Sequence, residues 1–418
     1  MIRTLFIIIS VFLGVAAYGQ PLEKTTPEAV GMSSGHLKYA DEAILRAIDD
    51  GDIPGAVLTV VRHGKIAYQK AYGNRRLVPE REPMTVNTVF DLASCTKPVA
   101  TAMSAMVLLE RGGIRLLDPA DYYIKEFQNW RGADGKQHKI RIIDLLTHTS
   151  GLPSYVTLAK LEREQGSLSK EALIKYICTC KREFEPQSGF RYSCLNYIIL
   201  QQIIEKVSGE SLRGFARKNI FAPLQMNCTD FIPCTQDGDS RPIITSLPCW
   251  ADNTEQLEDI TAPTEMLGNG YILCGTVQDP LARVPMQGVS GNAGLFSSAD
   301  DLAIFCATLL AGGKHNGVRI LSPLTVETMT RIPRATAQTG RTPGWDIFTA
   351  YASANGDIFS PSTFGHTGHT GTSIIIDPEN DTAVILLTNA VHPSEGHSIV
   401  RLRSLISNIA AAAIRPEK

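Results

Sequence analysis

The chain has 418 residues, of which 44% are hydrophobic and 20% charged, and its formal net charge is −2. This length suits one large domain or two interlocked ones, and the apolar fraction is enough for a sizeable core. The composition excludes a disordered or coiled-coil chain. Because the charge is nearly balanced, nucleic acid is also excluded as the main partner.

The first residues have the pattern of an export signal. Arg3 supplies a positive start, Leu5–Ala17 is an apolar run too short for a comfortable membrane span, and Ala17–Gly19 ends in small residues. We therefore expect residues 1–19 to be removed as a signal peptide, with a retained N-terminal anchor as the alternative. The mature chain is expected to carry no membrane span and to work in the periplasm or as a secreted protein.

The mature chain is predicted to begin with a helix and a hairpin. Ser33–Asp50 has the apolar spacing of a helix, and Gly55–Arg62 with Lys65–Tyr72 reads as two strands joined at the turn His63–Gly64. Gly31–Gly35 also fits the G-x-S-x-G pattern of a nucleophile elbow. No buried strand precedes it, so Ser33 or Ser34 is interpreted as a helix cap.

The middle of the chain is predicted to be mostly helical, with long Gly- and Pro-containing loops between the helices. The expected helices are Thr101–Arg111, Ile140–Leu146, Lys170–Cys178, Asn196–Val207, Ser211–Asn219 and Ala299–Leu310.

Near the C-terminus, Thr372–Asp377 and Thr382–Thr388 predict a second hairpin, and Val391–Ala413 predicts a closing helix. We expect an α+β fold in which both chain ends contribute to one antiparallel sheet flanked by helices. Residues 20–100 and 340–418 would form an α/β subdomain and residues 101–339 a mostly helical one, together making a single domain with a cleft between them.

Ser94-x-x-Lys97 is the first candidate for catalysis. In a helix, the two side chains stand one turn apart on the same face. A lysine can take the proton of a serine hydroxyl if burial and nearby positive charge lower its pKa. Ser167 and Lys170 have the same spacing, but their surroundings indicate a loop and a helix cap. A capping serine beside a solvated lysine is the alternative at Ser94.

Tyr192-Ser193-Cys194 is the second candidate. It lies just before a predicted helix, and Tyr192 can carry a proton if nearby cations lower its pKa. Taken alone, a tyrosine in such a loop is more often a packing residue.

The third candidate is the glycine-rich segment 364–371, which contains His366, Thr367, Gly368 and His369. Its glycines allow close approach of backbone to a ligand, and free N–H groups at a strand edge can hold a developing oxyanion. A glycine-rich turn with two surface histidines is the alternative. His148 could be catalytic, but a helix-end histidine held by backbone is the preferred interpretation.

The sequence contains no motif for a metal or a nucleotide cofactor, so neither is expected. Nine cysteines leave at least one free thiol if the others pair. Three of them, Cys228, Cys234 and Cys249, lie in a loop-like region and could pair.

The three motifs, in this order, resemble those of the serine β-lactamase and penicillin-binding-protein superfamily. The similar branch contains class C β-lactamases, D,D-carboxypeptidases, esterases and D-aminopeptidases. The resemblance covers roughly residues 27–406. Four further stretches are similar to that branch: Ile53–Val57, Leu145–Leu152, Gly288–Leu295 and Leu387–Asn389.

The resemblance implies that Ser94 attacks an ester, amide or lactam carbonyl and that Lys97 and Tyr192 share the proton transfers. The backbone N–H groups of Ser94 and His369 would form the oxyanion hole, and no cofactor is implied. The expected substrate is a small molecule or a peptidoglycan fragment; the oligomeric state is left open.

Two departures bear on the substrate. Position 194 is Cys where the family often has an asparagine that contacts a substrate amide, and His366 replaces a lysine. A histidine with a pKa of about 6.5 would change charge near neutrality. We therefore expect an exported serine hydrolase of esterase or D-Ala-peptidase type. A weak class C-like β-lactamase and a silent penicillin- or muropeptide-binding protein are the alternatives.

Overall fold

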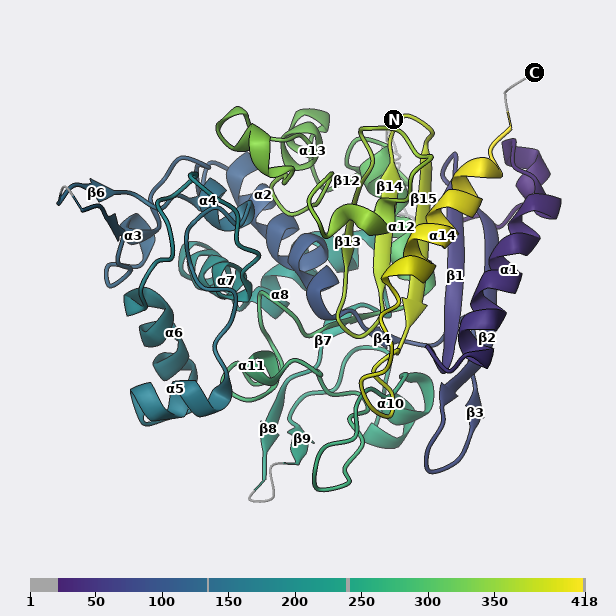
Figure 1. Cartoon of the computed structure of the whole chain (residues 1–418), viewed down its shortest axis with the longest axis horizontal. Coiled ribbons are helices and arrows are strands. Elements are labelled where there is room, and N and C mark those ends of the chain that lie inside the picture. Colours follow the sequence, from purple (N-terminus) through teal and green to yellow (C-terminus); the bar gives the residue numbers. More distant parts are fainter. Residues whose placement is uncertain (1–21, 134, 238–240, 416–418) are drawn as a thin grey trace, which may run out of the picture.

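A six-stranded antiparallel sheet forms one side of the molecule (Figure 1). The structure, a computed structural model, describes residues 22–133, 135–237 and 241–415, so the expected signal peptide lies outside the described residues. The strand order is β13 (Phe364–Thr367), β14 (Ser373–Asp377), β15 (Thr382–Thr388), β1 (Gly55–Arg62), β2 (Lys65–Arg76) and β3 (Glu82–Pro83).

The two predicted hairpins meet in the middle of this sheet. β1 pairs with β15 from Ala56 opposite Thr388 to Arg62 opposite Thr382. The expectation that both chain ends build one antiparallel sheet is therefore confirmed. Every residue of β1, β14 and β15 is buried, which is why these strands are almost continuously apolar.

Helices cover both faces of the sheet. α1 (Ser34–Asp49) and α14 (Val400–Ala412) pack on one face, and α12 (Ala299–Leu310) packs on the other. Side chains of β1 alternate between the two layers: Val57 and Val61 join the core that contains α12, whereas Leu58 and Val60 face α1 and α14.

The second part of the molecule is a helical body around α2 (Met103–Glu110) and α7 (Cys194–Ser208) (Figure 1). Its other helices are α3 (Ala120–Tyr123), α4 (Ile142–Leu146), α5 (Leu158–Gln165), α6 (Lys170–Thr179), α8 (Leu212–Ala216), α9 (Ala222–Leu224), α10 (Thr254–Ile260), α11 (Pro280–Arg283) and α13 (Pro323–Thr330).

Short strands connect these helices. β4 (Phe90–Asp91), β10 (Leu295–Ser297) and β7 (Asp230–Phe231) form a three-stranded sheet. The remaining strands form two-residue or three-residue pairs: β5 (Trp130–Arg131) with β6 (Gln137–His138), β8 (Cys234–Gln236) with β9 (Pro242–Ile244), and β11 (Lys314–His315) with β12 (Val318–Arg319).

Several helix boundaries differ from the sequence prediction, and two of these differences are informative. The C-terminal helix begins at Val400 rather than Val391, because Pro393 lacks the N–H that a helix interior needs and the preceding segment turns there. The helix predicted over Thr101–Arg111 begins at Met103 and is preceded by a wide helical turn, Lys97–Ala102, which begins at the last residue of the Ser94-x-x-Lys97 motif.

One apolar core joins the sheet to the helical body. It includes Val57 of β1 and Phe364 of β13, together with Val99 after the candidate nucleophile and Leu195 of α7. The residues that carry the candidate motifs therefore lie where the two parts of the fold meet.

Candidate active site

Ser94 lies in a tight turn, Ala93–Cys95, directly after β4. Ala93 before it adopts a left-handed backbone conformation with a φ of 45°. The buried carboxylate of Asp91 supports this turn, because it accepts hydrogen bonds from the N–H of Ala93 at 2.8 Å and of Gln278 at 2.7 Å. Burial raises the pKa of Asp91 to about 6.

Lys97 is fully buried directly below Ser94. Its Nζ donates to Ser94 Oγ at 3.0 Å and to the carbonyl oxygen of Asn292 at 2.9 Å, and lies 3.5 Å from Cys194 Sγ. The same nitrogen lies 5.0 Å from the centre of the Tyr192 ring. Ser94, Lys97, Tyr192 and Cys194 thus form one cluster, although they come from distant parts of the sequence.

The pKa values of Lys97 and Tyr192 depend on burial and on their neighbours in this cluster. Burial lowers the pKa of Lys97, but interactions with Cys194 and Tyr192 raise it, and the net direction is upward. Burial raises the pKa of Tyr192 despite the opposing effect of Lys97. The lowered pKa values that would let Lys97 and Tyr192 carry protons are therefore not a property of the free site. Both directions favour an ammonium ion on Lys97 beside a neutral phenol on Tyr192 at neutral pH.

His366 is buried on β13, next to the cavity. Its Nδ1 lies 2.9 Å from the carbonyl oxygen of Thr367, so this nitrogen carries the proton, and Nε2 has no partner among the described residues. Burial, followed by the charges of Arg341 and Lys97, holds the pKa of His366 well below 6.5. The expectation that His366 changes charge near neutrality is therefore wrong.

The turn after β13 is tied to the Ser94 turn. Thr370 Oγ1 donates to the carbonyl oxygen of Asp91 at 2.7 Å, and Thr372 Oγ1 donates to that of Leu92 at 3.0 Å. A β-carbon on Gly368 would clash with the same Leu92 oxygen. Glycine is required here because the two backbones touch.

The backbone N–H groups of Ser94 and His369 both have room for a ligand. Neither donates a hydrogen bond within the part of the chain that the structure describes. Both residues line the same cavity. Two free donors beside a nucleophile are the arrangement that an oxyanion hole needs.

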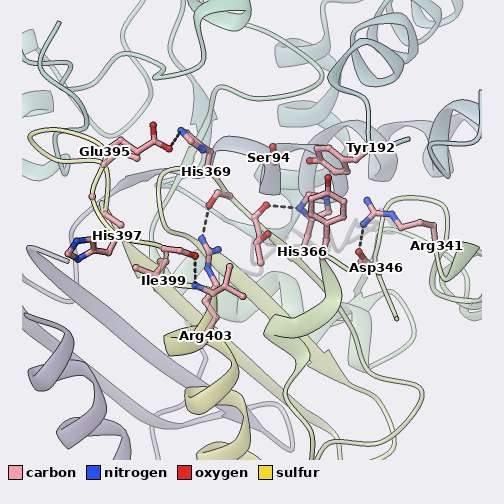
Figure 2. A pocket seen from close by; sticks show the side chains of 18 residues that line it. Ser94, Tyr192, Arg341, Asp346, His366, His369, Glu395, His397, Ile399 and Arg403 are labelled. Carbon is pink, nitrogen blue, oxygen red and sulfur yellow. Dashed lines mark hydrogen bonds and ion pairs between the residues drawn. The ribbon is translucent and has the colours of Figure 1, made fainter. Parts of the chain in front are cut away.

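The cavity beside Ser94 has a volume of about 450 Å³ and is also lined by Tyr192, His366, Thr367, Gly368 and His369. Figure 2 shows these side chains together with several from the C-terminal part of the chain. Cys194 does not line the cavity, because its thiol points to Lys97 instead.

Arg341 is a cavity residue that sequence reasoning missed. It is 1% exposed, and its Nη1 pairs with Asp346 at 2.7 Å (Figure 2). Its Nε and Nη2 have no hydrogen-bond partner among the described residues, and its guanidinium lies 5.5 Å from the centre of the Tyr192 ring. Tyr351 and Arg403 also line the cavity. None of these residues belongs to a short motif, so only the folded chain could reveal them.

The competing serines and histidines have structural positions. Ser33 caps α1, and Ser167 is an exposed residue before Ser169, which caps α6. His148 is held by backbone, as expected: its Nδ1 accepts from the N–H of Ser193 at 3.0 Å.

The nine cysteines are all free. In the part of the chain that the structure describes, no group of three or more His, Cys, Asp or Glu residues could hold a metal ion. In the same part, no helix combines the length and apolarity that crossing a membrane requires.

Comparison with known proteins identifies the family. The model of the Beta-lactamase family matches residues 40–406. A protein of Salmonella agona (strain SL483) named "Putative D-alanyl-D-alanine carboxypeptidase" is 32% identical over 403 residues, covering 94% of this chain and 91% of the relative.

Two solved structures have the same fold. EstCE1, a hydrolase with promiscuous acyltransferase activity, matches with a TM-score of 0.65 and 25% identity, over 90% of this chain and 99% of the other. The octameric penicillin-binding protein homologue from Pyrococcus abyssi matches with a TM-score of 0.63 and 23% identity, over 90% and 76% of the two chains. The chain thus belongs to the β-lactamase family of serine hydrolases.

Proposed function

We propose that this protein is an exported hydrolase that forms an acyl-enzyme on Ser94. The observation that carries the proposal is the 3.0 Å contact between Ser94 Oγ and the buried Nζ of Lys97, next to Tyr192 and open to the cavity. A nucleophile within hydrogen-bond reach of its proton acceptor, with a second group that orients the acceptor, is the signature of nucleophilic catalysis.

The proton path uses the Lys97–Tyr192 pair. Once the pair has lost one proton to the solvent, it can accept the hydroxyl proton of Ser94 as Oγ bonds to the substrate carbonyl carbon. The backbone N–H groups of Ser94 and His369 would hold the oxyanion. The pair then returns the proton to the leaving group, and a water molecule hydrolyses the acyl-enzyme by the same steps.

We propose that the preferred substrates are acyl compounds with a free carboxylate, such as peptides that end in D-alanine. Arg341 supports this proposal, because its side chain lines the cavity and its Nε and Nη2 have no hydrogen-bond partner among the described residues. Guanidinium groups bind carboxylates through paired N–H donors. The name of the Salmonella relatives agrees with this substrate class.

A neutral ester is the second candidate substrate. The buried, uncharged His366 gives the cavity no cation at the position where the superfamily motif has lysine, and the half-exposed ring of Tyr351 adds an apolar wall. EstCE1, a structural neighbour, is described as a hydrolase with acyltransferase activity.

Covalent labelling tests the role of Ser94. A fluorophosphonate probe should add to the peptide that contains Ser94, and Ser94→Ala should abolish labelling while the thermal transition stays in place. Ser167→Ala is the matched control, because that serine has the same spacing to a lysine but is exposed on a surface loop. An adduct at Ser167 or Ser33 would overturn the assignment.

A substrate panel separates the candidate activities. Wild type and Arg341→Lys should be compared on a D-alanyl-D-alanine peptide, a p-nitrophenyl ester and nitrocefin. We expect Arg341→Lys to raise KM for the peptide, because the planar pair of donors is lost, and to leave the ester unchanged. Equal effects on both substrates would refute the carboxylate role. Labelling without turnover of any substrate would favour a binding protein.

The proposed export rests on the pattern at residues 1–19. The N-terminus of the protein recovered from outside the cytoplasm should lie within a few residues of Gln20. A protein that retains Met1 would refute cleavage.

A further inference from the structure

His148 lies two residues beyond the end of α4, in a left-handed backbone conformation with a φ of 60°. Histidine, asparagine and aspartate tolerate this conformation better than most side chains. The residue is fully buried. A buried residue keeps such a rarely populated backbone conformation only where the surrounding structure determines it, so we expect His148 to have a defined role in this loop.

His148 holds both neighbours of Tyr192. The carbonyl oxygen of His148 accepts from the N–H of Arg191 at 3.0 Å, and its Nδ1 accepts from the N–H of Ser193 at 3.0 Å. The imidazole ring also stacks on the Tyr192 ring, with centres 4.5 Å apart and planes tilted by 33°. His148 therefore binds the backbone on both sides of Tyr192, at Arg191 and at Ser193, and contacts one face of the Tyr192 ring.

The hydrogen bonds define the protonation state of this imidazole. Nδ1 accepts from the backbone of Ser193 and lies 3.3 Å from Asn196 Nδ2, so it must carry a lone pair. Burial, together with the charges of Arg341 and Lys97, holds the pKa of His148 well below 6.5. A neutral ring places no second cation beside the Lys97 ammonium.

We infer that His148 is a positioning residue that fixes the Tyr192 phenol over Lys97. It does not line the cavity. Its ring also lies 5.2 Å from the Tyr197 ring, but the contacts that fix the chain around the phenol are those to Tyr192 and its two neighbours. The inference rests on the proposed function, because it assigns His148 to the proton path of the Ser94 acylation step. It predicts that the loss of the Nδ1 acceptor slows acylation without weakening substrate binding.

Two substitutions separate the acceptor from the bulk of the side chain. In His148→Asn, Oδ1 can occupy the position of Nδ1, and asparagine tolerates the left-handed backbone. His148→Leu keeps apolar volume but has no acceptor. Thr147→Val is the matched control in the same turn: it removes a buried hydroxyl that donates to Ile143 at 2.8 Å and does not touch Tyr192.

A double-mutant cycle with Tyr192→Phe tests whether His148 acts through the phenol. The readout is the rate of fluorophosphonate labelling, with kcat and KM for the ester measured alongside. Positioned proton transfer is worth about 10²- to 10⁴-fold, so we expect His148→Leu to lower the rate by at least about tenfold. In the Tyr192→Phe background, the same substitution should lower the labelling rate only slightly further.

The remaining outcomes are also specific. His148→Asn should recover most of the rate, KM should change little in both variants, and Thr147→Val should lower the unfolding temperature without lowering the rate. Equal losses from His148→Leu in both backgrounds would show a merely structural role and overturn the inference.

Hydrogen exchange tests the geometry without any activity. The amide of Ser193 should exchange faster in His148→Leu than in wild type and should stay protected in His148→Asn. Unchanged protection in His148→Leu would overturn the inference even if the enzyme is active. A wild-type protein that does not label at Ser94 would instead overturn the proposed function, and the exchange result would still decide whether His148 holds this segment.

Discussion

His366 and His148 are buried imidazoles that both contact the Tyr192 ring, and neither forms an ion pair among the described residues. For both, burial is the largest cause that holds the pKa well below 6.5. A charged imidazole would lose its hydration there and would face Arg341 and Lys97. These residues therefore contribute shape and hydrogen bonds rather than charge.

The low pKa of His366 predicts a pH-dependent contribution to stability. In the unfolded chain its pKa is about 6.5, so below that pH the unfolded state binds a proton that the folded state does not. The contribution is present above pH 6.5 and is lost as the pH falls. When the pH falls from 7.5 to 5.5, the free energy of unfolding should decrease by about 1.4 kcal/mol more in wild type than in His366→Asn.

Urea unfolding of the two proteins at both pH values measures this difference. The comparison with the variant is needed because Asp91 and Asp301, whose pKa values burial raises to about 6 and about 7, change stability in the opposite direction over the same range. Equal losses in wild type and His366→Asn would contradict the buried, neutral state.

At the scale of elements, the site depends on contact between two turns. The turn after β4 carries Ser94, and the turn between β13 and β14 carries His369. Two threonine hydroxyls bridge them, from Thr370 to Asp91 and from Thr372 to Leu92. Arg403 of α14 holds the second turn from the other side, donating to the carbonyl oxygens of Gly368 at 2.7 Å and Thr372 at 3.2 Å.

Gly368→Ala should separate these turns. Its β-carbon would meet both the Leu92 carbonyl oxygen and Thr372 Oγ1, so the backbone of the second turn must shift. If His369 supplies an oxyanion donor, acylation should fall on the order of a hundredfold, because removing one such donor costs about 3 kcal/mol. The rate of fluorophosphonate labelling measures the effect.

Gly268→Ala is the matched control for this prediction. A β-carbon there would have no heavy atom within 4 Å, so neither the fold nor the site should change. A Gly368→Ala protein that folds normally and labels at the wild-type rate would show that the turn does not supply the oxyanion donor.

At the scale of the whole molecule, the sheet and the helical body share a core. Phe364 of β13 and Ile374 of β14 belong to the same apolar cluster as Ile198 and Leu195 of α7. Arg62 of β1 also joins the chain ends, because its side chain donates to the carbonyl oxygen of Val30 at 2.8 Å and to Thr382 Oγ1 at 3.0 Å. Neither part buries its apolar surface without the other.

The shared core predicts one cooperative thermal transition. Ile374→Ala in the sheet and Ile198→Ala in the helical body remove fully buried side chains, and each should cost about 2–5 kcal/mol. Calorimetry should show a single transition that both substitutions move down together. Two transitions, each moved by only one substitution, would indicate independently folding parts.

Much of the fold could be predicted from local sequence. Alternating and continuous apolar runs predict the hairpins β1–β2 and β14–β15, and the requirement that Ser94 meet His366 predicts that both hairpins lie in one sheet. The spacing of Ser94 and Lys97 predicts their contact, because helical geometry places residues three apart on one face. The hairpins and the contact between Ser94 and Lys97 depend on residues that are close together in the sequence, so local patterns are sufficient to predict them.

Only the tertiary structure decided the surroundings of these groups. Arg341, Tyr351 and Arg403 enter the cavity from segments without a short motif, and His148 contacts Tyr192 across a loop. The direction of a pKa shift likewise depends on burial and on charges from distant segments. Burial, followed by the charges of Arg341 and Lys97, lowers the pKa of His366. A thiol and a phenol raise the pKa of Lys97 against the effect of burial. No local pattern names these partners.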